Sequence, residues 1–488
     1  MNDDLDHPKE ECGVFGVFAP GRDVSRIAFF ALHAMQHRGQ ESAGIAVADD
    51  GRVIVQRDLG LVSQVFDESS LRTLTGSMAI GHVRYSTTGA NKWDNAQPVT
   101  RTGPQGIVAL GHNGNLTNTG YLRAALAEEG VAMNATTDSE LIAAAVAQSQ
   151  GSLLEAVAAA MPRLAGAFSV VAMTAHELVA FRDPFGVRPL VIGRLPDAGW
   201  CVASETCAFD QIGARLEREV GPGEAVRITG NGIESVQAMP SRGPKLCVFE
   251  SIYFARPDSI ISGQAVWDAR RAMGTALAEE SPADADLVVG LPDSGTPAAV
   301  GFANASGIPY AEAVVRNRYV GRSFIQPEQH LRQNGVRMKF NPLRSVIGGK
   351  RLVVVDDSIV RGTTMRQIVT LLEEAGAREV HLRISSPPVA WPCFYGIDMA
   401  TRDELIAASS TIEEIRQAVG ATSLAYLSLD GLERAIGQPA TNQCRACFTG
   451  EYPIPVPGEA LKLRFELEAD AAVRSAQKRA TEAARASV

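Results

Sequence analysis

The chain has 488 residues, a length that predicts two to four domains, each large enough to bury a full hydrophobic core. Hydrophobic residues make up 45% of the chain and the formal net charge is -9, a composition that is ordinary for cytosolic α/β enzymes and disfavours nucleic acid as a general partner. Since there is no signal peptide and no apolar run of membrane-spanning length, we expect a cytoplasmic protein with no membrane partner. We therefore expect its seven cysteines to stay reduced and to serve metal binding or catalysis.

Cys12 follows eleven residues, of which five are acidic. If residues 1–11 are removed as a propeptide, Cys12 carries a free α-amino group beside its thiol. The reference pKa of a thiol is about 8.5 and that of an α-amine is about 7.7 to 8.0, so the amine can accept the thiol proton near neutral pH. The position therefore predicts an N-terminal catalytic nucleophile. The alternative is a small apolar residue that begins a buried strand.

Helices and short strands are predicted in the first half of the chain, separated by Gly-rich turns. Their patterns place helices over residues 24–36 and 137–148 and strands over residues 168–173 and 178–181. Asp138, Ser139 and Glu140 form a capping signal at the start of the second helix. Residues 238–245 then concentrate Pro, Gly and charge, which favours a domain boundary. We expect a first domain over residues 12–240.

Apolar strands alternate with helices in the second half. Strands are predicted at residues 287–290, 352–356 and 379–384, with a helix after the first of these and another over residues 366–375. This order indicates a parallel sheet covered by helices. We expect this α/β domain to span residues 241–457. The Ala-rich and charged tail, residues 458–488, is predicted to be helical.

A basic segment interrupts the second domain. Residues 316–351 contain nine Lys or Arg and one acid, Glu328. Such a cluster can bind a polyanion through bidentate and point-charge contacts, although a solvated basic face is the alternative. Since Gly and Pro interrupt the segment, we expect residues 316–345 to form a long mobile loop that closes over a bound anion.

The segment from Arg351 to Thr364 carries the strongest chemical signal of the second half. A buried strand delivers Asp356 and Asp357 to its carboxyl end, where ligands bind in open parallel sheets. The loop that follows, with the hydroxyls of Thr363 and Thr364 and the start of a helix, suits a phosphate monoester. Adjacent carboxylates need a partner, which Mg2+ or a ribose diol would supply. The segment resembles the signature of the phosphoribosyltransferases.

That resemblance implies a type I phosphoribosyltransferase domain, a parallel α/β fold. Residues 291–297 resemble the pyrophosphate loop of the same family. The resemblance further implies a Mg2+ ion held at Ser294, Asp356 and Asp357. The residues implied to bind phosphoribosylpyrophosphate are Ser294, Gly295, Arg318, Asp356, Asp357, Ser358, Arg361, Gly362, Thr363 and Thr364.

Five short strings of the first half share a second resemblance. They are Cys12-Gly13, Gln36 to Ser42, Gly81 to Ser86, Gly111 to Asn115 and Thr137 to Glu140. In this order they resemble the class II glutamine amidotransferases, which are N-terminal nucleophile hydrolases with an αββα sandwich. The strings Arg182 to Leu190 and Ser204 to Thr206 extend the resemblance over almost the whole first domain.

Each string implies a role in glutamine hydrolysis. Cys12 would attack the carboxamide of glutamine. The side chain of Asn113 and the N–H of Gly114 would stabilise the oxyanion that forms. Arg84 would bind the α-carboxylate of glutamine in a bidentate pair, and Asp138 would bind its α-ammonium group. His37, His82 and His112 lack metal-ligand spacing and are interpreted as packing or orienting residues.

The remaining cysteines suggest a metal site. Cys444 and Cys447 form a C-x2-C pair, which alone is compatible with zinc, a redox pair, an iron-sulfur cluster or no site. One branch of the family resembled here carries a 4Fe-4S cluster on four cysteines, and this sequence retains all four: Cys247, Cys393, Cys444 and Cys447. Cys201 and Cys207 are left over and are expected in the core.

Together the two halves predict a glycosyltransferase of the pentosyltransferase class. It would make 5-phosphoribosylamine, glutamate and diphosphate from phosphoribosylpyrophosphate, glutamine and water, the first committed step of purine synthesis. Ammonia would be channelled between the two sites, because in bulk water it would be protonated. The resemblance also implies a homotetramer and inhibition by purine nucleotides. The alternatives are another class II amidotransferase, such as a hexosamine-phosphate synthase, or a DNA-binding regulator that senses phosphoribosylpyrophosphate.

Overall fold

The computed structural model describes residues 12–49, 51–85, 92–133, 135–196, 199–230, 232–317, 335–397 and 401–456. The chain divides into two compact units. The first unit holds the described residues up to 246 together with 394–397 and 452–456, and the second unit holds 247–393 and 401–451. The first unit is thus discontinuous in sequence. The predicted propeptide and C-terminal tail lie outside the described residues.

Within the described residues, the first unit contains two β-sheets. A seven-stranded sheet has the order β11-β9-β10-β1-β4-β2-β3, and a six-stranded sheet has the order β13-β12-β8-β7-β6-β5. The strands are β1 (Gly13–Phe18), β2 (Ser42–Asp49), β3 (Arg52–Leu59), β4 (Met78–Arg84), β5 (Val99–Gly103), β6 (Gly106–Leu116), β7 (Gly166–Met173), β8 (Leu178–Arg182), β9 (Val191–Arg194), β10 (Trp200–Ala203), β11 (Arg215–Glu219), β12 (Glu224–Thr229) and β13 (Gly232–Gln237). The helices are α1 (Val24–Ala34), α2 (Val62–Val65), α3 (Glu68–Thr73), α4 (Thr119–Glu128), α5 (Asp138–Gln148), α6 (Leu153–Ala160) and α7 (Cys207–Ile212).

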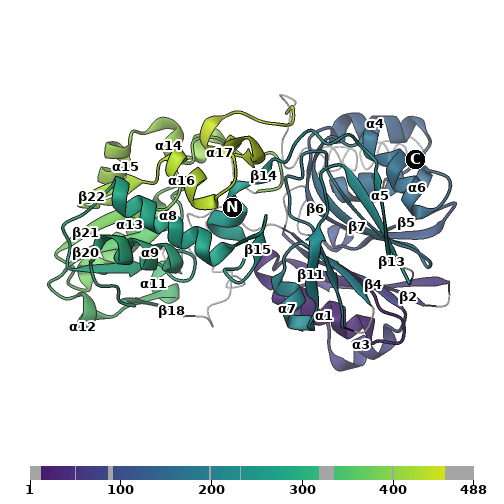
Figure 1. The fold of residues 1–488 in the computed structure, drawn as a ribbon, viewed down its shortest axis with the longest axis horizontal. Coiled ribbons are helices and arrows are strands. Elements are labelled where there is room, and N and C mark those ends of the chain that lie inside the picture. The colour runs from purple at the N-terminus through teal and green to yellow at the C-terminus, as the bar shows by residue number, and fades with distance from the viewer. Residues whose placement is uncertain are drawn as a thin grey trace, which may run out of the picture. The chain divides into compact units, whose positions relative to one another are not determined.

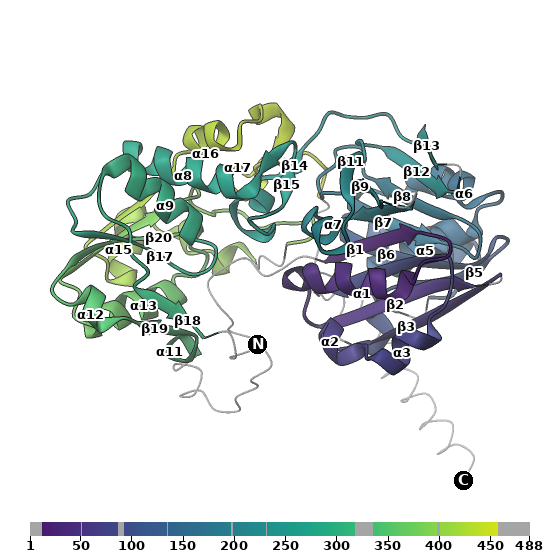
Figure 2. The same cartoon turned by 60° about the horizontal axis from the view of Figure 1, so that its bottom comes forward.

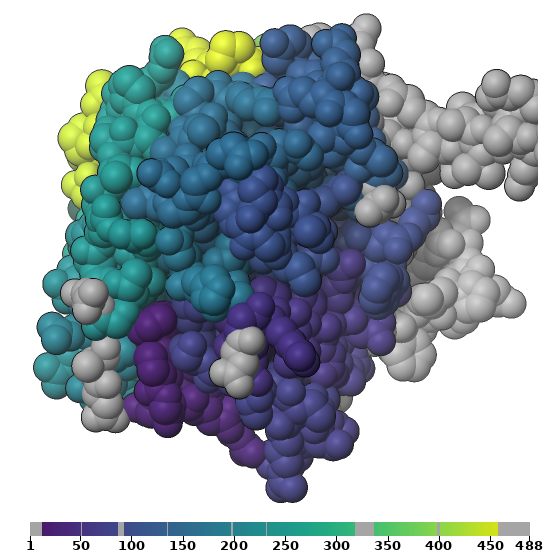
Figure 3. All heavy atoms as spheres, turned by 90° about the vertical axis from the view of Figure 1, so that its right-hand side faces the viewer, coloured from purple at the N-terminus to yellow at the C-terminus, as the bar shows by residue number. Residues whose placement is uncertain are grey.

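The two sheets pack face to face between two helical layers (Figure 2). Helix α1 lies on the seven-stranded sheet beside α7, while α5 and α6 lie on the six-stranded sheet. In a view of one face of this unit, the segments of α4 to α6 (blue) and of α1 to α3 (purple) occupy separate regions (Figure 3). Between the sheets lies a core that includes Val14, Ile80, Val171 and Ile192. The expected αββα sandwich is confirmed.

Local sequence explains where α1 begins and which face it buries. The side chain of Asp23 accepts a hydrogen bond from Arg26 N and so caps the helix. Ala28, Ala31 and Leu32 recur at helical spacing and are completely buried. The predicted helix over residues 24–36 is confirmed, with its end at Ala34.

The start of α5 differs from the predicted capping signal. Thr137 is the N-cap residue, and no side chain caps the helix there. Asp138 instead accepts a hydrogen bond from Leu116 N at 3.0 Å, and Glu140 accepts one from Ala135 N. Asp138 is therefore used in a contact with β6, while Glu140 holds the segment that leads into α5.

The second unit is built on the parallel sheet β17-β20-β21-β22, as predicted (Figure 1). Its strands are β15 (Ile260–Ile261), β16 (Gln264–Ala265), β17 (Leu287–Gly290), β18 (Val314–Arg316), β19 (Phe340–Pro342), β20 (Arg351–Asp356), β21 (Glu379–Ile384), β22 (Ser423–Tyr426) and β23 (Gln443–Cys444), which pairs with β14 (Leu246–Cys247). Its helices are α8 (Val266–Glu280), α9 (Thr296–Ser306), α11 (Gly335–Lys339), α12 (Arg344–Ile347), α13 (Thr363–Glu374), α14 (Ile406–Ser409), α15 (Ile412–Val419), α16 (Leu429–Ile436) and α17 (Ala446–Thr449).

The continuous apolar run of β20 explains how this sheet is covered. Leu352 and Val354 join a core with Ile368 of α13 and Ile415 of α15. Helix α9 contacts β17 and β20, and α8 packs against α9. The strand is buried on both faces, as expected for a parallel sheet. None of the helices in the described ranges is both long and apolar enough to cross a membrane.

The basic segment contains more regular structure than predicted. Residues 318–334 lie outside the described part of the chain, but residues 335–347 form α11, β19 and α12, and β19 pairs antiparallel with β18. The expectation of one continuous loop over 316–345 is therefore wrong for its C-terminal third, because Phe340 and Ile347 are buried in the core.

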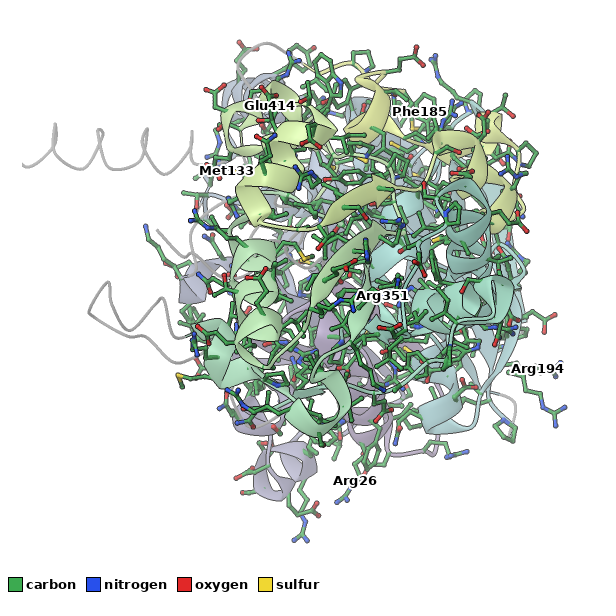
Figure 4. All side chains as sticks on the ribbon, turned by 90° about the vertical axis from the view of Figure 1, so that its left-hand side faces the viewer. Arg26, Met133, Phe185, Arg194, Arg351 and Glu414 are labelled. Atoms are coloured by element: carbon green, nitrogen blue, oxygen red, sulfur yellow. The ribbon has the colours of Figure 1, made fainter. Side chains whose placement is uncertain are left out.

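Several arginines of this segment already have acidic partners within the second unit. Arg337 pairs with Glu374 at 2.6 Å, and Arg351, labelled at the start of β20 in Figure 4, pairs with Asp284 and Asp286. These contacts are typical of a solvated basic face. They leave fewer cations for an anionic ligand than the count of residues suggested.

Candidate active sites

Cys12 lies directly before β1, whose pairing with β4 sets Gly13 opposite Val83. The thiol donates a hydrogen bond to Tyr85 O at 3.3 Å, and Cys12 is 6% exposed. Burial raises the pKa of the thiol to about 11, although the charge of Arg84 and the bond to Tyr85 act in the opposite direction. At neutral pH the thiol is protonated, so nucleophilic attack requires a base.

A buried charged network holds the backbone of Cys12. Arg38 donates from Nε to Cys12 O at 3.0 Å and from Nη1 to Glu205 Oε1 at 2.5 Å. His37 Nε2 lies 2.7 Å from the same carboxylate oxygen. Burial alone would raise the pKa of Glu205, but the charges of His37 and Arg38 outweigh it and hold that pKa below its ordinary value.

The sequence offered no role for Arg38 or Glu205. Both stand inside strings that carried the resemblance, Gln36 to Ser42 and Ser204 to Thr206. A charged residue within each of these short polar strings was the available signal.

Two residues expected to bind the ends of glutamine are buried in the same unit. Arg84 ends β4, is 2% exposed, and lies 3.7 Å from Glu41. Asp138 begins α5 and is 4% exposed, with one carboxylate oxygen bound to Leu116 N. The charges of Arg84 and Asp138 both act on the pKa of Cys12, so the fold brings cation, anion and thiol together.

Strand β6 carries the expected oxyanion donors. In the described part of the chain, Asn113 Nδ2 is buried and has no hydrogen-bond partner. Gly114 has φ +142°, and a Cβ atom there would lie 2.1 Å from Ala167 O, so only glycine fits. Phe168 faces Gly114 across β6 and β7, but its N–H donates to Asp183 Oδ2 and its carbonyl oxygen accepts from Asp183 N. Gly114 and Phe168 therefore form a non-hydrogen-bonded pair of the antiparallel sheet.

His82 and His112 hold this strand in place through hydrogen bonds. His82 Nε2 donates to His112 O at 3.0 Å, and burial lowers the pKa of His82 to about 3. His112 N donates to Gln97 Oε1 at 2.8 Å, and His112 Nδ1 lies 3.2 Å from Ser139 Oγ. Burial also lowers the pKa of His112. Both rings are neutral near pH 7, which agrees with their interpretation as orienting residues.

In the second unit, β20 ends at two buried acids. Asp356 is 1% exposed and Asp357 is completely buried. Ser358 Oγ donates to Asp357 Oδ1 at 2.6 Å, and Ser385 N donates to Asp356 O. Two consecutive carboxylates that are this deeply buried offer oxygen ligands of the kind that Mg2+ prefers.

The loop after β17 packs directly against the end of β20. In register, Gly290 pairs with Val355. A Cβ atom on Gly295 would lie 2.5 Å from Val355 O and 3.2 Å from Asp356 Cα. The loop that contains Ser294 therefore packs against the backbone at the end of β20.

The remaining predicted phosphate residues follow in the next loop. Gly362, with φ +79°, precedes α13, which begins at Thr363 and continues through Thr364. Arg361 is bound to Glu404 by two of its nitrogens. Arg318 lies outside the described residues.

Four cysteine thiols come together in the second unit. Burial and the neighbouring thiols of Cys247, Cys444 and Cys393 raise the pKa of Cys447 well above its ordinary value. Three of the four are buried and Cys393 is partly exposed. Nowhere in the described ranges do three or more His, Cys, Asp or Glu side chains stand in an arrangement ready for a metal ion. The donor chemistry nonetheless fits a cluster with four thiolate ligands.

The two other cysteines of the core, Cys201 and Cys207, lie in the first unit, as expected.

Comparisons with known proteins cover both units. A family described as "Glutamine amidotransferase domain" matches residues 82–211, and one described as "Phosphoribosyl transferase domain" matches residues 263–385. The amidophosphoribosyltransferase of Synechococcus elongatus is 53% identical over 472 residues, which cover 95% of each chain.

Two solved structures share the fold over nearly the whole chain. One, of the allosteric regulatory enzyme of purine biosynthesis, matches with a TM-score of 0.88 at 46% identity, covering 92% of this chain and 98% of the other. Another, of glutamine phosphoribosylpyrophosphate amidotransferase from B. subtilis complexed with ADP and GMP, matches with a TM-score of 0.87 at 46% identity, covering 92% of this chain and 99% of that one. With relatives this similar over its full length, the chain belongs to the amidophosphoribosyltransferase family.

Proposed function

We propose that this chain makes 5-phosphoribosylamine, glutamate and diphosphate from phosphoribosylpyrophosphate, glutamine and water, with Cys12 as the nucleophile that releases ammonia from glutamine. The reaction is that of the family, and it is a step of purine biosynthesis.

Glutamine is held at its two charged ends before its carboxamide reacts. Arg84 binds the α-carboxylate and Asp138 binds the α-ammonium group, so that the carboxamide lies against Cys12. Cys12 Sγ attacks the carboxamide carbon as its proton passes to the α-amine of the same residue. Ammonia leaves with that proton, and water then hydrolyses the thioester to glutamate. Arg38 and Glu205 keep the Cys12 backbone in place.

The observation that carries this proposal is the buried Asn113 side chain. An amide N–H2 that is buried without a partner costs free energy, unless a ligand or water accepts its hydrogen bond. Its position, one residue before Gly114, supports a pair of donors for an oxyanion. Removal of one such donor typically slows turnover by about 100-fold to 1,000-fold.

The second unit would bind phosphoribosylpyrophosphate at the carboxyl ends of β17 and β20. The 5-phosphate fits the loop formed by Ser358 to Gly362 and the start of α13 at Thr363 and Thr364, with Arg361 and Arg318 as further cations. Ser294 and Gly295 would bind the diphosphate. The nitrogen of ammonia forms a bond to C1 of the ribose while the bond from C1 to the diphosphate oxygen breaks.

Asp356, Asp357 and Ser294 would hold Mg2+, whose charge stabilises the departing diphosphate when the ion is bound. Ammonia would pass between the two sites without release to bulk water. There it would be protonated and lose its nucleophilic electron pair.

We assign the thiols of Cys247, Cys393, Cys444 and Cys447 to a 4Fe-4S cluster, in which each iron takes one thiolate. The cluster would join segments that are far apart in the sequence. We further propose a homotetramer that purine nucleotides inhibit. The B. subtilis relative that was solved with ADP and GMP supports nucleotide binding.

The test compares wild type with Cys12→Ala in anaerobic assays of diphosphate release from phosphoribosylpyrophosphate. With glutamine as the nitrogen donor, we expect the variant to lose at least 1,000-fold in turnover, because the nucleophile is absent. With ammonia as the donor, both proteins should give the same rate. Undiminished use of glutamine by the variant would exclude Cys12 as the nucleophile.

The same samples test the processing that the mechanism requires. The intact mass of active wild type should correspond to a chain that begins at Cys12, since only removal of residues 1–11 gives Cys12 a free α-amine. A fully active chain that begins at Met1 would contradict the N-terminal base, whatever the result with Cys12→Ala.

A further inference from the structure

Residues 394–397, which we call the return segment, belong to the first unit, although the residues on both sides of them in the sequence belong to the second. Asn115 Nδ2 donates to Phe394 O at 3.0 Å, and Arg188 Nε donates to Tyr395 O at 2.9 Å. Both acceptors are backbone oxygens, so the path of the main chain is fixed regardless of side-chain identity. The rings of Phe394 and Tyr395 also pack edge-on against Tyr452 of the same unit.

Gly396 brings the return segment into contact with Gly114. A Cβ atom at Gly396 would lie 3.1 Å from both Cα and C of Gly114, which is closer than side chains normally approach a backbone. Gly396 also has φ +115°, a conformation that L-residues rarely adopt. Gly114 is therefore confined by two backbones, those of Ala167 and Gly396.

The two contacts fall at Gly114, the second proposed oxyanion donor, and at the residue directly after it. Asn115 follows Gly114 and is tied to Phe394, while Gly114 itself abuts Gly396. Such donors act only when they stand about 2.7 to 3.1 Å from the position where the oxyanion forms. A shift of even part of an ångström weakens the bonds to the transition state more than it weakens binding of glutamine.

We propose that the return segment positions the oxyanion hole of the glutaminase site, with Gly396 and Asn115 as its positioning residues. The inference rests on the proposed roles of Cys12, Asn113 and Gly114. It adds that the glutaminase site is completed by backbone from the far half of the chain, which touches none of the reacting atoms.

The test compares Gly396→Ala with Gly232→Ala. Gly232 has φ +116°, almost the same as Gly396, but a Cβ atom there meets no heavy atom within 4 Å. Both variants thus carry the backbone strain, and only Gly396→Ala carries the contact with Gly114. We expect Gly396→Ala to lower kcat with glutamine by about tenfold or more, while KM for glutamine changes less than threefold. The rate of ammonia-dependent synthesis should be the same in Gly396→Ala and Gly232→Ala.

A second variant, Asn115→Asp, keeps the size of the side chain but removes the donor to Phe394 O. It should show the same split between kcat and KM, and it decides the question if Gly396→Ala does not fold. Equal kcat with glutamine in the two glycine variants, or a parallel fall of glutamine-dependent and ammonia-dependent rates, overturns the proposal. Failure of wild type to use glutamine would instead overturn the function on which the proposal rests.

Discussion

Buried charges around Cys12 occur with opposite charges beside them. Arg38 and Glu205, exposed by about 1% each, share hydrogen bonds in the interior, and His37 reaches the same carboxylate. Arg84 lies near Glu41. A buried charge that loses its partner costs far more than an exposed one, because no water replaces the lost interaction. The precision of the Cys12 site therefore depends on residues that do not touch glutamine.

Glu205→Gln should lower the free energy of unfolding at pH 7 by about 3 to 5 kcal/mol, because Arg38 then stays buried without its counter-charge. The pKa of Glu205 is lower in the folded chain than the reference of about 4.3 in the unfolded chain. Its stabilising effect is thus complete above that reference and declines as the pH falls below it. The difference in melting temperature between variant and wild type should shrink from pH 7 to pH 3.5.

The matched control is Glu129→Gln, which removes an exposed ion pair with Arg163. This control should change the free energy of unfolding by less than about 1 kcal/mol at either pH. If Glu205→Gln melts like Glu129→Gln at pH 7, the buried network does not stabilise the site.

At the scale of elements, the parallel pairing of β17 with β20 brings two loops together. Gly290 and Val355 are paired in register, so the chain leaves both strands at the same edge of the sheet. Gly295 then packs onto the backbone of Val355 and Asp356. The second site is therefore positioned mainly by contacts between backbones.

Gly295→Ala should impair this site, because its methyl group would lie 2.5 Å from Val355 O, an atom that cannot move without shifting β20. We expect kcat/KM for phosphoribosylpyrophosphate to fall about tenfold or more with glutamine and with ammonia alike. The free energy of unfolding should fall by about 1 to 3 kcal/mol. Steady-state assays with each nitrogen donor measure the first effect, and chemical denaturation measures the second.

Gly221→Ala is the control, since a Cβ atom there would meet only the side chain of Glu224, at 3.3 Å and 3.8 Å, and no backbone atom. Selective loss of one nitrogen donor in Gly295→Ala would contradict the assignment of this loop to the phosphoribosylpyrophosphate site.

The regular elements could be predicted from the sequence because their signals are local. Helix α1 and strands β20 and β21 lie within two residues of their predicted limits, since apolar periodicity reports directly on burial. The short elements α11, β19 and α12 were hidden by the charge of the basic segment. The bond from Asp138 to Leu116 joins residues 22 positions apart, and no local pattern reports it.

The same limit applies to the candidate sites. Cys12 stood out because removal of the eleven residues before it would free its α-amine. Asp356 and Asp357 stood out because they end a buried strand, and the resemblance supplied roles for Asn113 and Gly114. The return segment could not be found in this way, because its partner Asn115 lies 279 positions away in the sequence. Only the fold brings such backbone contacts into view.

At the scale of the whole molecule, the four clustered thiols come from segments that span most of the second unit. In the sequence they run from Cys247 to Cys447. A shared cluster would cross-link these segments, and its loss would leave several buried thiols without a ligand.

Anaerobically purified wild type should contain about four iron atoms per chain. Cys447→Ser should contain less than half of that and should melt at a lower temperature, because one thiolate ligand is gone. Colorimetric iron analysis and visible absorption measure occupancy, and differential scanning calorimetry measures stability.

Cys201→Ala serves as the control, because it removes a buried thiol from the core of the first unit. It should destabilise the core while keeping its iron. Iron-free wild type from anaerobic preparation would contradict the cluster.

The discontinuous first unit has a consequence for how this protein can be divided. The chain leaves the unit after residue 246, re-enters it at residues 394–397 and re-enters it again at residue 452. A gene truncated at residue 246 would encode a hydrolase module that lacks its own return segment. A chimaera that joins the first 246 residues of this chain to the second half of a relative would place the relative's return segment against Gly114. The two catalytic modules are therefore interleaved in the gene, and recombination at the apparent boundary would separate residues that must be inherited together.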